Sequence, residues 1–255
     1  MQGSPVGQRP TLGAIAVLHD ITEVEQAERA RKDVVANISH ELRTPLAAIR
    51  GYAETLLDGA LEDPANNRKF VEAICRNTVR LGDIASDLLE LSELEAERQP
   101  PPAEKVSVRE AANAAMRAVE NEAVAHHVDV FAGAIEDVHV MGRRLHLEHA
   151  LENLLHNAIR FNRPGGEVRL EASLAGDQVR IKVSDTGIGI PSQDLPRIFE
   201  RFYCVDKARS RDTGGAGLGL SIVKHVAQKM AGTVGVESRL GKGSAFTLQF
   251  PAADP

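Results

Sequence analysis

The chain has 255 residues, of which 43% are hydrophobic and 26% charged, and its formal net charge is −6. This apolar content is enough to bury a core, and the mixed charges are typical of a folded protein. The acidic balance and the aromatic content of 4% argue against nucleic-acid binding through a basic surface or through base stacking. Two distant cysteines, Cys75 and Cys204, cannot form a disulfide framework or a four-cysteine zinc site. No apolar run reaches the roughly 20 residues that span a bilayer and no signal peptide is evident, so we expect a reducing, aqueous compartment.

The N-terminal segment contains a short apolar run and then a charged helical stretch. Residues 13–19 (GAIAVLH) predict a β-strand, which resembles the end of a PAS sensor domain. The charged residues from Glu23 to Lys32 predict a helix that continues directly into the next helical segment.

Two long helical segments follow, separated by a turn between Gly59 and Pro64. Apolar residues recur at helical spacing in both, which predicts one apolar stripe on each helix: Ile38, Leu42, Leu46, Ile49, Tyr52 and Leu56 in the first, and Ile74, Leu81, Ile84, Leu88 and Leu91 in the second. Because two helices cover each other poorly, we expect two such hairpins to form a four-helix bundle in a homodimer. A monomeric hairpin packed on the C-terminal domain is the alternative.

The proline-rich run at residues 99–102 is the best domain boundary, because prolines end helices and favour extended linkers. After it, helical patterns at residues 108–125 and 143–159 alternate with strand patterns at 128–131, 138–141, 167–174, 178–185, 233–237 and 245–250. Gly176 and Asp177 predict a hairpin turn between the third and fourth strands. This order favours an α+β sandwich with helices on one face of a mostly antiparallel sheet. The glycine motifs of Rossmann and P-loop nucleotide sites do not occur.

His40 is the first candidate for chemistry. It lies two residues from the stripe positions on either side, so on a helix its side chain points away from the apolar stripe. An exposed imidazole next to Glu41 can be held in one tautomer and activated as a nucleophile. Thr44 lies one helical turn further on nearly the same face, and Pro45 is expected to bend the helix.

Two glycine-containing patterns in the C-terminal half suit a nucleotide. Asp185 ends a predicted strand and is followed by Gly187 and Gly189. A carboxylate there can accept a hydrogen bond from adenine, and glycines let the backbone approach a flat ligand. The glycine-rich run 214–219 precedes a helix at residues 222–226, whose N-terminus suits a phosphate chain. The polar residues 204–213 before it predict a mobile lid.

A third pattern places Asn153, Asn157 and Arg160 on one face of a helix. An amide oxygen is a suitable neutral ligand for a magnesium ion that already carries phosphate oxygens and water. An arginine one turn further can pair with phosphate through two parallel hydrogen bonds.

Taken in order, these patterns resemble the sensor histidine kinases of bacterial two-component systems, from about Asp33 to Pro251. The string 37–46 (NISHELRTPL) is similar to the family's H box, and the asparagine helix is similar to its N box. Residues 185–191 (DTGIGIP), 197–203 (RIFERFY) and 215–219 (GAGLG) are similar to its G1, F and G2 boxes. The chain is similar to the phosphate-regulon sensor kinases in particular.

The resemblance implies a role for each matched position. His40 would be the phosphoacceptor, Glu41 its base, and Thr44 the residue that orients a water for dephosphorylation of a partner. Asn157 would bind Mg²⁺, and Arg160 and Cys204 depart from the lysine and arginine that are commoner there. The implied ATP-binding residues are Asn153, Asn157, Arg160, Phe161, Asp185, Gly187, Gly189, Gly215, Gly217, Leu218 and Gly219.

The resemblance also implies an organisation in three parts. These are the end of a PAS-like sensor segment with a signalling helix (1–32), a dimerisation and histidine phosphotransfer hairpin (33–99), and a catalytic ATP-binding domain with a GHKL-type α/β sandwich (100–255). The implied reaction is autophosphorylation of His40 from ATP with Mg²⁺, followed by transfer to an aspartate of a response regulator receiver domain. Phosphatase activity toward that partner is implied as well. No nucleic-acid partner is expected.

The implied location is the cytoplasm, and an upstream anchor in the inner membrane is left open. Two other functions compete with this interpretation. A catalytically degenerate kinase could serve as a signalling scaffold, for which Cys204 is the best support. An ATP-dependent clamp of the chaperone or topoisomerase type would share the nucleotide fold, but the H-box string argues against it.

Overall fold

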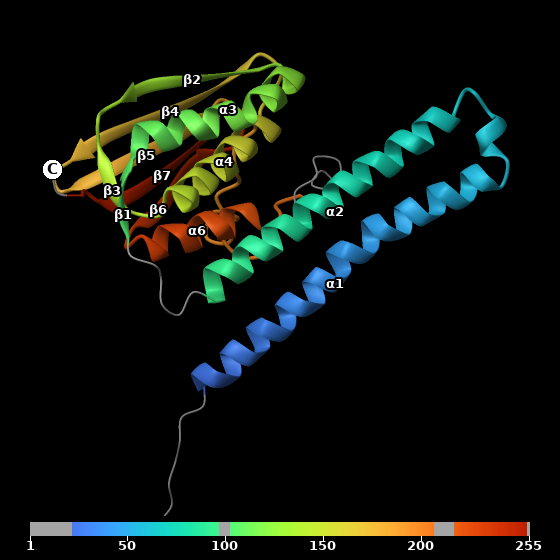
Figure 1. The fold of residues 1–255 in the computed structure, drawn as a ribbon, viewed down its shortest axis with the longest axis horizontal. Helices are drawn as coiled ribbons and strands as arrows, with labels where there is room; N and C mark the ends of the chain where they lie inside the picture. Colours follow the sequence, from blue (N-terminus) through green and yellow to red (C-terminus); the bar gives the residue numbers. More distant parts are fainter. Residues whose placement is uncertain (1–21, 97–102, 207–216, 254–255) are drawn as a thin grey trace, which may run out of the picture. The chain divides into compact units, whose positions relative to one another are not determined.

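A computed structural model describes residues 22–96, 103–206 and 217–253 of the chain (Figure 1). The predicted strand at residues 13–19 lies outside these ranges. Contacts within the chain divide it into two units, residues 1–39 and residues 40–255. Among the described residues, no helix has both the length and the apolar character needed to cross a membrane.

Two long helices, α1 (Thr22–Leu57) and α2 (Asn67–Ala96), confirm the predicted helical segments, including the helical continuation of residues 23–32 into the first of them. Gly59 has a φ of 118°, which only glycine adopts readily, and a short 3-10 helix, η1 (Ala60–Glu62), follows it. Asp63 then closes the turn, because its carboxylate accepts hydrogen bonds from the Ala65 amide (3.0 Å) and from the Asn66 side chain (2.8 Å).

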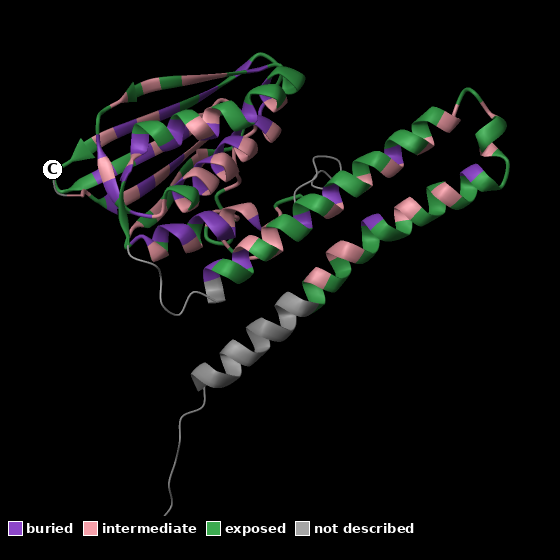
Figure 2. Cartoon of the chain, viewed as in Figure 1, coloured by how far each residue is buried: buried purple, intermediate pink, exposed green. Residues whose placement is uncertain are grey.

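The apolar stripes of α1 and α2 are only partly covered within one chain. Leu56, Ile84, Leu91 and Leu94 are buried, but Leu46 is 60% exposed although it belongs to the predicted stripe. Figure 2 shows how few buried positions these helices carry compared with the C-terminal half of the chain. The large apolar side chains that remain exposed here are Leu46, Tyr52, Leu57, Leu61, Val71, Val79 and Leu89.

The C-terminal half contains a five-stranded sheet in the order β2-β4-β5-β7-β6. Its strands are β2 (Val128–Ile135), β4 (Gly166–Ala175), β5 (Gln178–Asp185), β6 (Thr233–Arg239) and β7 (Gly243–Pro251). Only the β2–β4 pair is parallel, so the prediction of a mostly antiparallel sheet is confirmed. The predicted turn at Gly176 is confirmed too, because Ala175 pairs with Gln178 across it.

A second, two-stranded antiparallel sheet joins β1 (Glu104–Ser107) to β3 (His139–Gly142). The strand β3 was predicted, at residues 138–141, but β1 was not. Strand β1 has four residues and only Val106 is buried in it, so its sequence carries too little alternation to indicate a strand.

Three helices lie on one face of the five-stranded sheet: α3 (Val108–His126), α4 (Arg144–Arg160) and α6 (Gly219–Lys229) (Figure 1). The first two agree with the predicted helices to within one residue. Their apolar faces meet the alternating inward residues of the strands, and together they form the core. Fully buried large side chains of this core include Leu147, Leu151, Leu154, Leu155, Ile159, Leu170, Ile181, Leu218, Ile222 and Phe250.

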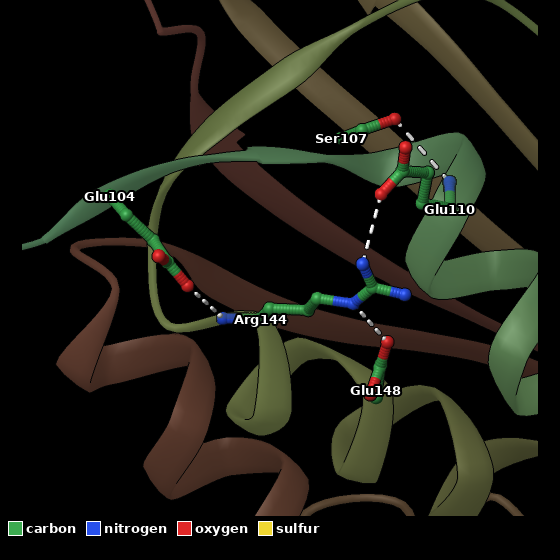
Figure 3. A network of polar contacts seen from close by, with 5 residues as sticks. All are labelled: Glu104, Ser107, Glu110, Arg144 and Glu148. Carbon is green, nitrogen blue, oxygen red and sulfur yellow. Dashed lines mark hydrogen bonds and ion pairs between the residues drawn. The ribbon is translucent and has the colours of Figure 1, made fainter.

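A polar network ties β1, α3 and α4 together at the surface (Figure 3). The Arg144 guanidinium donates to Glu148 at 2.6 Å and to Glu110 at 3.0 Å, and its backbone amide donates to Glu104 at 3.3 Å. The hydrogen bond with Glu148 raises the pKa of Arg144 above its usual value. Ser107 caps α3 by accepting from the Glu110 amide. Because these ion pairs are exposed, they fix the geometry of the helix starts more than they stabilise the fold.

Candidate functional site

A cavity of about 830 Å³ brings the three predicted nucleotide motifs together. This volume lies within the range typical of small-molecule sites. Helix α4, the loop after β5 and the start of α6 contribute to its wall, and α2 contributes acidic residues to another side. The predicted ATP-binding residues that line it are Asn153, Asn157, Arg160, Phe161, Asp185, Gly189, Gly217 and Gly219. Gly187 and Leu218 lie beside this wall without lining it, and Gly215 lies outside the described residues.

Asp185 is the last residue of β5 and presents its carboxylate at the cavity wall. Burial raises its pKa, while hydrogen bonds from Gly187 and Ser244 act in the opposite direction. One carboxylate oxygen, Oδ1, accepts from the Gly187 amide at 2.8 Å, so this oxygen is held in place by its own loop. The arrangement can accept a further hydrogen bond from a ligand amine.

The two glycines after Asp185 serve different structural needs. A Cβ at Gly187 would overlap the Phe161 carbonyl oxygen, so this glycine permits close packing of the loop against the end of α4. Gly189 has a φ of 68°, and a Cβ there would overlap the Arg239 carbonyl oxygen. Of the two, Gly189 is the one whose backbone lines the cavity.

The N-terminus of α6 makes close contacts with α4, and the residues just before α6 contact the segment around Phe202. A Cβ at Gly219 would lie 2.5 Å from Oδ1 of Asn153, whose amide nitrogen donates to the His149 carbonyl at 3.0 Å. Gly217 has a φ of 73°, and its carbonyl accepts from the Phe202 amide at 2.8 Å. Leu218 is fully buried and so anchors this entry into α6. Most of the predicted lid, residues 207–213, lies outside the described residues.

Asn157 lines the cavity one turn along α4 from Asn153. A magnesium ion in a nucleotide site takes one or two protein oxygens and completes its shell with phosphate and water. The side chain of Asn153 is held by its hydrogen bond to the His149 carbonyl, and Asn157, which also lines the cavity, carries an amide oxygen of the type that magnesium binds. This donor set therefore fits a magnesium ion that arrives with a phosphate chain.

Glu122 of α3 is a polar partner of this wall that the sequence analysis missed. Its Oε1 accepts from Nε of Arg160 at 2.7 Å, and its Oε2 contacts Nδ1 of His156. Burial would raise the pKa of Glu122, but the hydrogen bonds and charges of His156 and Arg160 outweigh burial and lower the pKa to about 2. Arg160 was predicted only as a phosphate partner. Its Nε is also bound by the Glu122 carboxylate, which does not line the cavity. The partners are 34 and 38 residues apart in the sequence, so no local pattern indicates them.

Asn162 is a second missed residue, and it is buried directly after α4. Its amide nitrogen donates to the Glu167 carbonyl at 3.1 Å, and its Oδ1 accepts from the Arg163 amide at 3.0 Å. The Thr186 hydroxyl accepts from the Glu167 amide at 2.9 Å. These bonds fix the end of α4 next to the loop that carries Asp185 and Gly187.

Acidic residues of α2 and histidine and arginine residues of α4 line the cavity together. Glu90 contacts Nδ1 of His149 at 2.9 Å, and this hydrogen bond raises the pKa of His149. Burial raises the pKa of Asp87 to about 6, helped by Glu90 and opposed by Arg160.

His40 is strongly exposed, with 76% of its side chain accessible, as predicted from its place off the apolar stripe. Its Nδ1 lies 3.7 Å from Oε1 of Glu41, and the other oxygen of Glu41 accepts from Arg80 of α2 at 3.1 Å. Arg80 was not predicted. The Thr44 hydroxyl donates to the His40 carbonyl at 3.2 Å. His40, Glu41 and Thr44 lie outside the lining of the cavity.

Two family models match the chain in succession. Residues 30–97 match the His Kinase A (phospho-acceptor) domain, and residues 142–254 match the histidine kinase-, DNA gyrase B- and HSP90-like ATPase. The chain is 41% identical over 239 residues to the sensor-like histidine kinase SenX3 of Mycobacterium tuberculosis, covering 94% of this chain and 58% of that protein.

Two other relatives show the same partial coverage. The chain is 38% identical to the phosphate regulon sensor protein PhoR of Pseudomonas aeruginosa and 34% identical to the sensor histidine kinase WalK of Bacillus subtilis. Each match covers 94% of this chain, but 54% and 39% of the two relatives. The chain thus spans about half the length of these relatives.

Solved structures of histidine kinases share the fold. Full-length ShkA in complex with AMPPNP superposes with a TM-score of 0.61 at 29% identity, covering 88% of this chain and 46% of that one. The histidine kinase ThkA, solved in complex with the response regulator protein TrrA, superposes with a TM-score of 0.70 at 22% identity, covering 92% and 68%.

Proposed function

We propose that this chain, which belongs to the sensor histidine kinase family, transfers the γ-phosphoryl group of ATP to His40 and then to an aspartate of a response regulator. The observation that carries this proposal is the cavity in which the α4 asparagines, Asp185 and the glycines at the start of α6 meet. The second support is the exposed His40 beside Glu41 on a helix within the matched phospho-acceptor region.

The cavity suits a nucleotide in one orientation. Asp185 accepts a hydrogen bond from the amino group of adenine, and Gly189 lets the backbone approach the ring. The phosphates then lie along α4 and the N-terminus of α6, where Arg160 and the helix dipole balance their charge. Asn157 holds Mg²⁺, which when bound neutralises charge on the phosphates during transfer.

His40 accepts the phosphoryl group through Nε2, because Nδ1 faces Glu41. The Nε2 lone pair forms a bond to the γ-phosphorus, and the bond from that phosphorus to the bridging oxygen breaks, so ADP leaves with the electron pair. The imidazolium that forms is stabilised by the Glu41 carboxylate, which accepts the Nδ1 proton. Since little covalent help is needed from the protein, alignment and charge compensation account for most of the rate.

We also propose the partners and the organisation of the chain. The exposed apolar side chains of α1 and α2 support a homodimer, and the solved complex of ThkA with TrrA supports a receiver domain as the phosphoryl acceptor. Thr44 orients a water that hydrolyses the aspartyl phosphate of the regulator and releases inorganic phosphate. We propose three parts, residues 1–32, 33–99 and 100–255, and a cytoplasmic location, where ATP is available. A catalytically degenerate scaffold is disfavoured because most of the predicted ATP-binding residues line the cavity.

Labelling of the whole chain with [γ-³²P]ATP and Mg²⁺ tests the proposed function. We expect label that is lost in acid and retained in base, as for a phosphoramidate, and no label in His40→Gln. We expect His40→Gln to bind ATP within a few-fold of the parent, because His40 does not line the cavity. Label that persists in His40→Gln at the parent's stoichiometry would assign the acceptor elsewhere.

A further inference from the structure

Glu122 supports the nucleotide wall from outside the cavity. His156 and Arg160 line the cavity, but Glu122 does not. The two carboxylate oxygens have separate partners on α4, since Oε1 accepts from Nε of Arg160 at 2.7 Å and Oε2 contacts Nδ1 of His156. A carboxylate that is fixed at both oxygens is a rigid support for either partner.

The negative charge of Glu122 near an ATP site would weaken ATP binding unless this residue also supported binding in another way. Hydrogen bonds from His156 and Arg160 lower the pKa of Glu122, so it stays ionised at neutral pH. An anion close to a triphosphate repels it, and the repulsion is strong where water is partly excluded. The geometry of Arg160 explains why the anion is tolerated.

A guanidinium group offers two edges for recognition. Glu122 occupies Nε of Arg160, which leaves the edge formed by the two terminal nitrogens for a ligand. That edge matches two phosphate oxygens in a bidentate arrangement, provided that the guanidinium plane is fixed.

We propose that Glu122 is a positioning residue that orients Arg160 toward the phosphates of the bound nucleotide. This inference rests on the proposed function, because it requires a nucleotide whose phosphates lie along α4. It assigns Glu122 no contact with the nucleotide itself.

Binding of ATP, ADP and adenosine to the whole chain, measured by calorimetry, tests the inference through Glu122→Gln. We expect ATP and ADP to bind about tenfold more weakly, because the glutamine oxygen can still accept from Arg160 but the charge that strengthens this hydrogen bond is lost. We expect adenosine binding to stay within about twofold, since Asp185 is untouched. The matched control is Glu120→Gln, which makes the same charge change at an exposed position of α3 and is expected to behave as the parent.

The direction of the change in ATP affinity distinguishes the orientation of Arg160 by Glu122 from simple repulsion between Glu122 and the phosphates. Removing a negative charge by itself strengthens the binding of an anionic ligand, so weaker ATP binding with unchanged adenosine binding in Glu122→Gln indicates lost orientation of Arg160. Unchanged or tighter ATP binding would overturn the inference, and so would an equal loss for adenosine, which indicates a general structural role. If the parent itself binds neither ATP nor ADP, the proposed function fails rather than this inference.

A double-mutant cycle shows whether Glu122 acts through Arg160. In an Arg160→Gln background, we expect Glu122→Gln to add less than a twofold further loss of ATP affinity, because the residue it orients is gone. A full additional tenfold loss would exclude action through Arg160. Should Glu122→Gln fail to melt as a folded protein, Glu122→Asp replaces it. This variant keeps the charge but shortens the reach, and it is expected to weaken ATP binding without changing adenosine binding.

Discussion

The Asp185 carboxylate is largely buried and accepts a hydrogen bond from its own loop. Its burial lowers the stability of the protein without nucleotide, but the same carboxylate can accept a hydrogen bond from a bound adenine. Burial raises its pKa, which means that the folded chain favours the protonated form more than the unfolded chain does. A neutral side chain of the same shape would remove this disadvantage. The same change would place a donor where adenine also donates.

We therefore expect Asp185→Asn to separate stability from binding. The melting temperature without nucleotide is expected to equal or exceed that of the parent, because an amide is easier to bury than a carboxylate. The increase that ADP with Mg²⁺ produces in the parent is expected to be mostly lost. Thermal melting with and without ADP measures both effects, with Asp177→Asn in the exposed β4–β5 turn as control. A full ADP-induced increase in Asp185→Asn would show that Asp185 does not bind the base.

Residues that act through distant partners were beyond the reach of sequence analysis. Glu122 is one of several charged positions on an amphipathic helix, and Arg80 is another such position on α2. Their partners lie 38 and 39 residues away in the sequence, so only the packed helices reveal the pairs. His40 and Asp185 could be chosen as candidates from the sequence because short motifs surround them.

Elements were predicted well where hydrophobic periodicity is strong. Helices α3 and α4 follow a clear helical period, and strands β4 and β5 alternate regularly around a glycine turn. The parallel pairing of β2 with β4 could not be predicted, because pairing depends on the tertiary arrangement and not on the pattern of either strand.

The loop after β5 contains Gly189, whose need for a glycine can be measured by substitution. Gly189 and Gly176 both have a φ of 68°, but a Cβ at Gly176 meets open space, whereas one at Gly189 overlaps the Arg239 carbonyl. We expect Gly176→Ala to lower the free energy of unfolding by about 1 kcal/mol, from backbone strain alone.

Gly189→Ala is expected to lower the free energy of unfolding by about 2 kcal/mol or more, because the overlap adds to the strain. Only this variant is expected to weaken ADP binding, since Gly189 lines the cavity and Gly176 lies in the β4–β5 turn. Urea unfolding and calorimetry give the two quantities. Equal destabilisation by both substitutions would contradict the role of the Arg239 contact.

At the scale of the whole molecule, α1 and α2 leave apolar surface that a second copy would cover. Leu46 is 60% exposed in the predicted stripe, and Leu174 in the C-terminal half is 51% exposed. We expect the whole chain to sediment as a dimer at micromolar concentration. Leu46→Glu is expected to raise the dimer dissociation constant at least about tenfold, because both copies lose a buried leucine.

Leu174→Glu makes the same substitution outside the predicted stripe and is expected to leave the dimer unchanged. Sedimentation velocity over a range of concentrations measures both variants. A parent chain that sediments as a folded monomer would remove the basis for the four-helix bundle. Equal weakening by the two substitutions would indicate a different interface.

The contact between Gly219 and Asn153 has a consequence for how such chains diverge. One residue belongs to the asparagine helix and the other to the glycine-rich entry into α6, yet a single methyl group at position 219 would press on the Asn153 amide. A larger residue at position 219 therefore requires the Asn153 side chain to move away from its present position or to be replaced. The two motifs are separate in the sequence but touch in the fold, so a substitution at position 219 is expected to disturb the hydrogen bond that Asn153 donates to the His149 carbonyl.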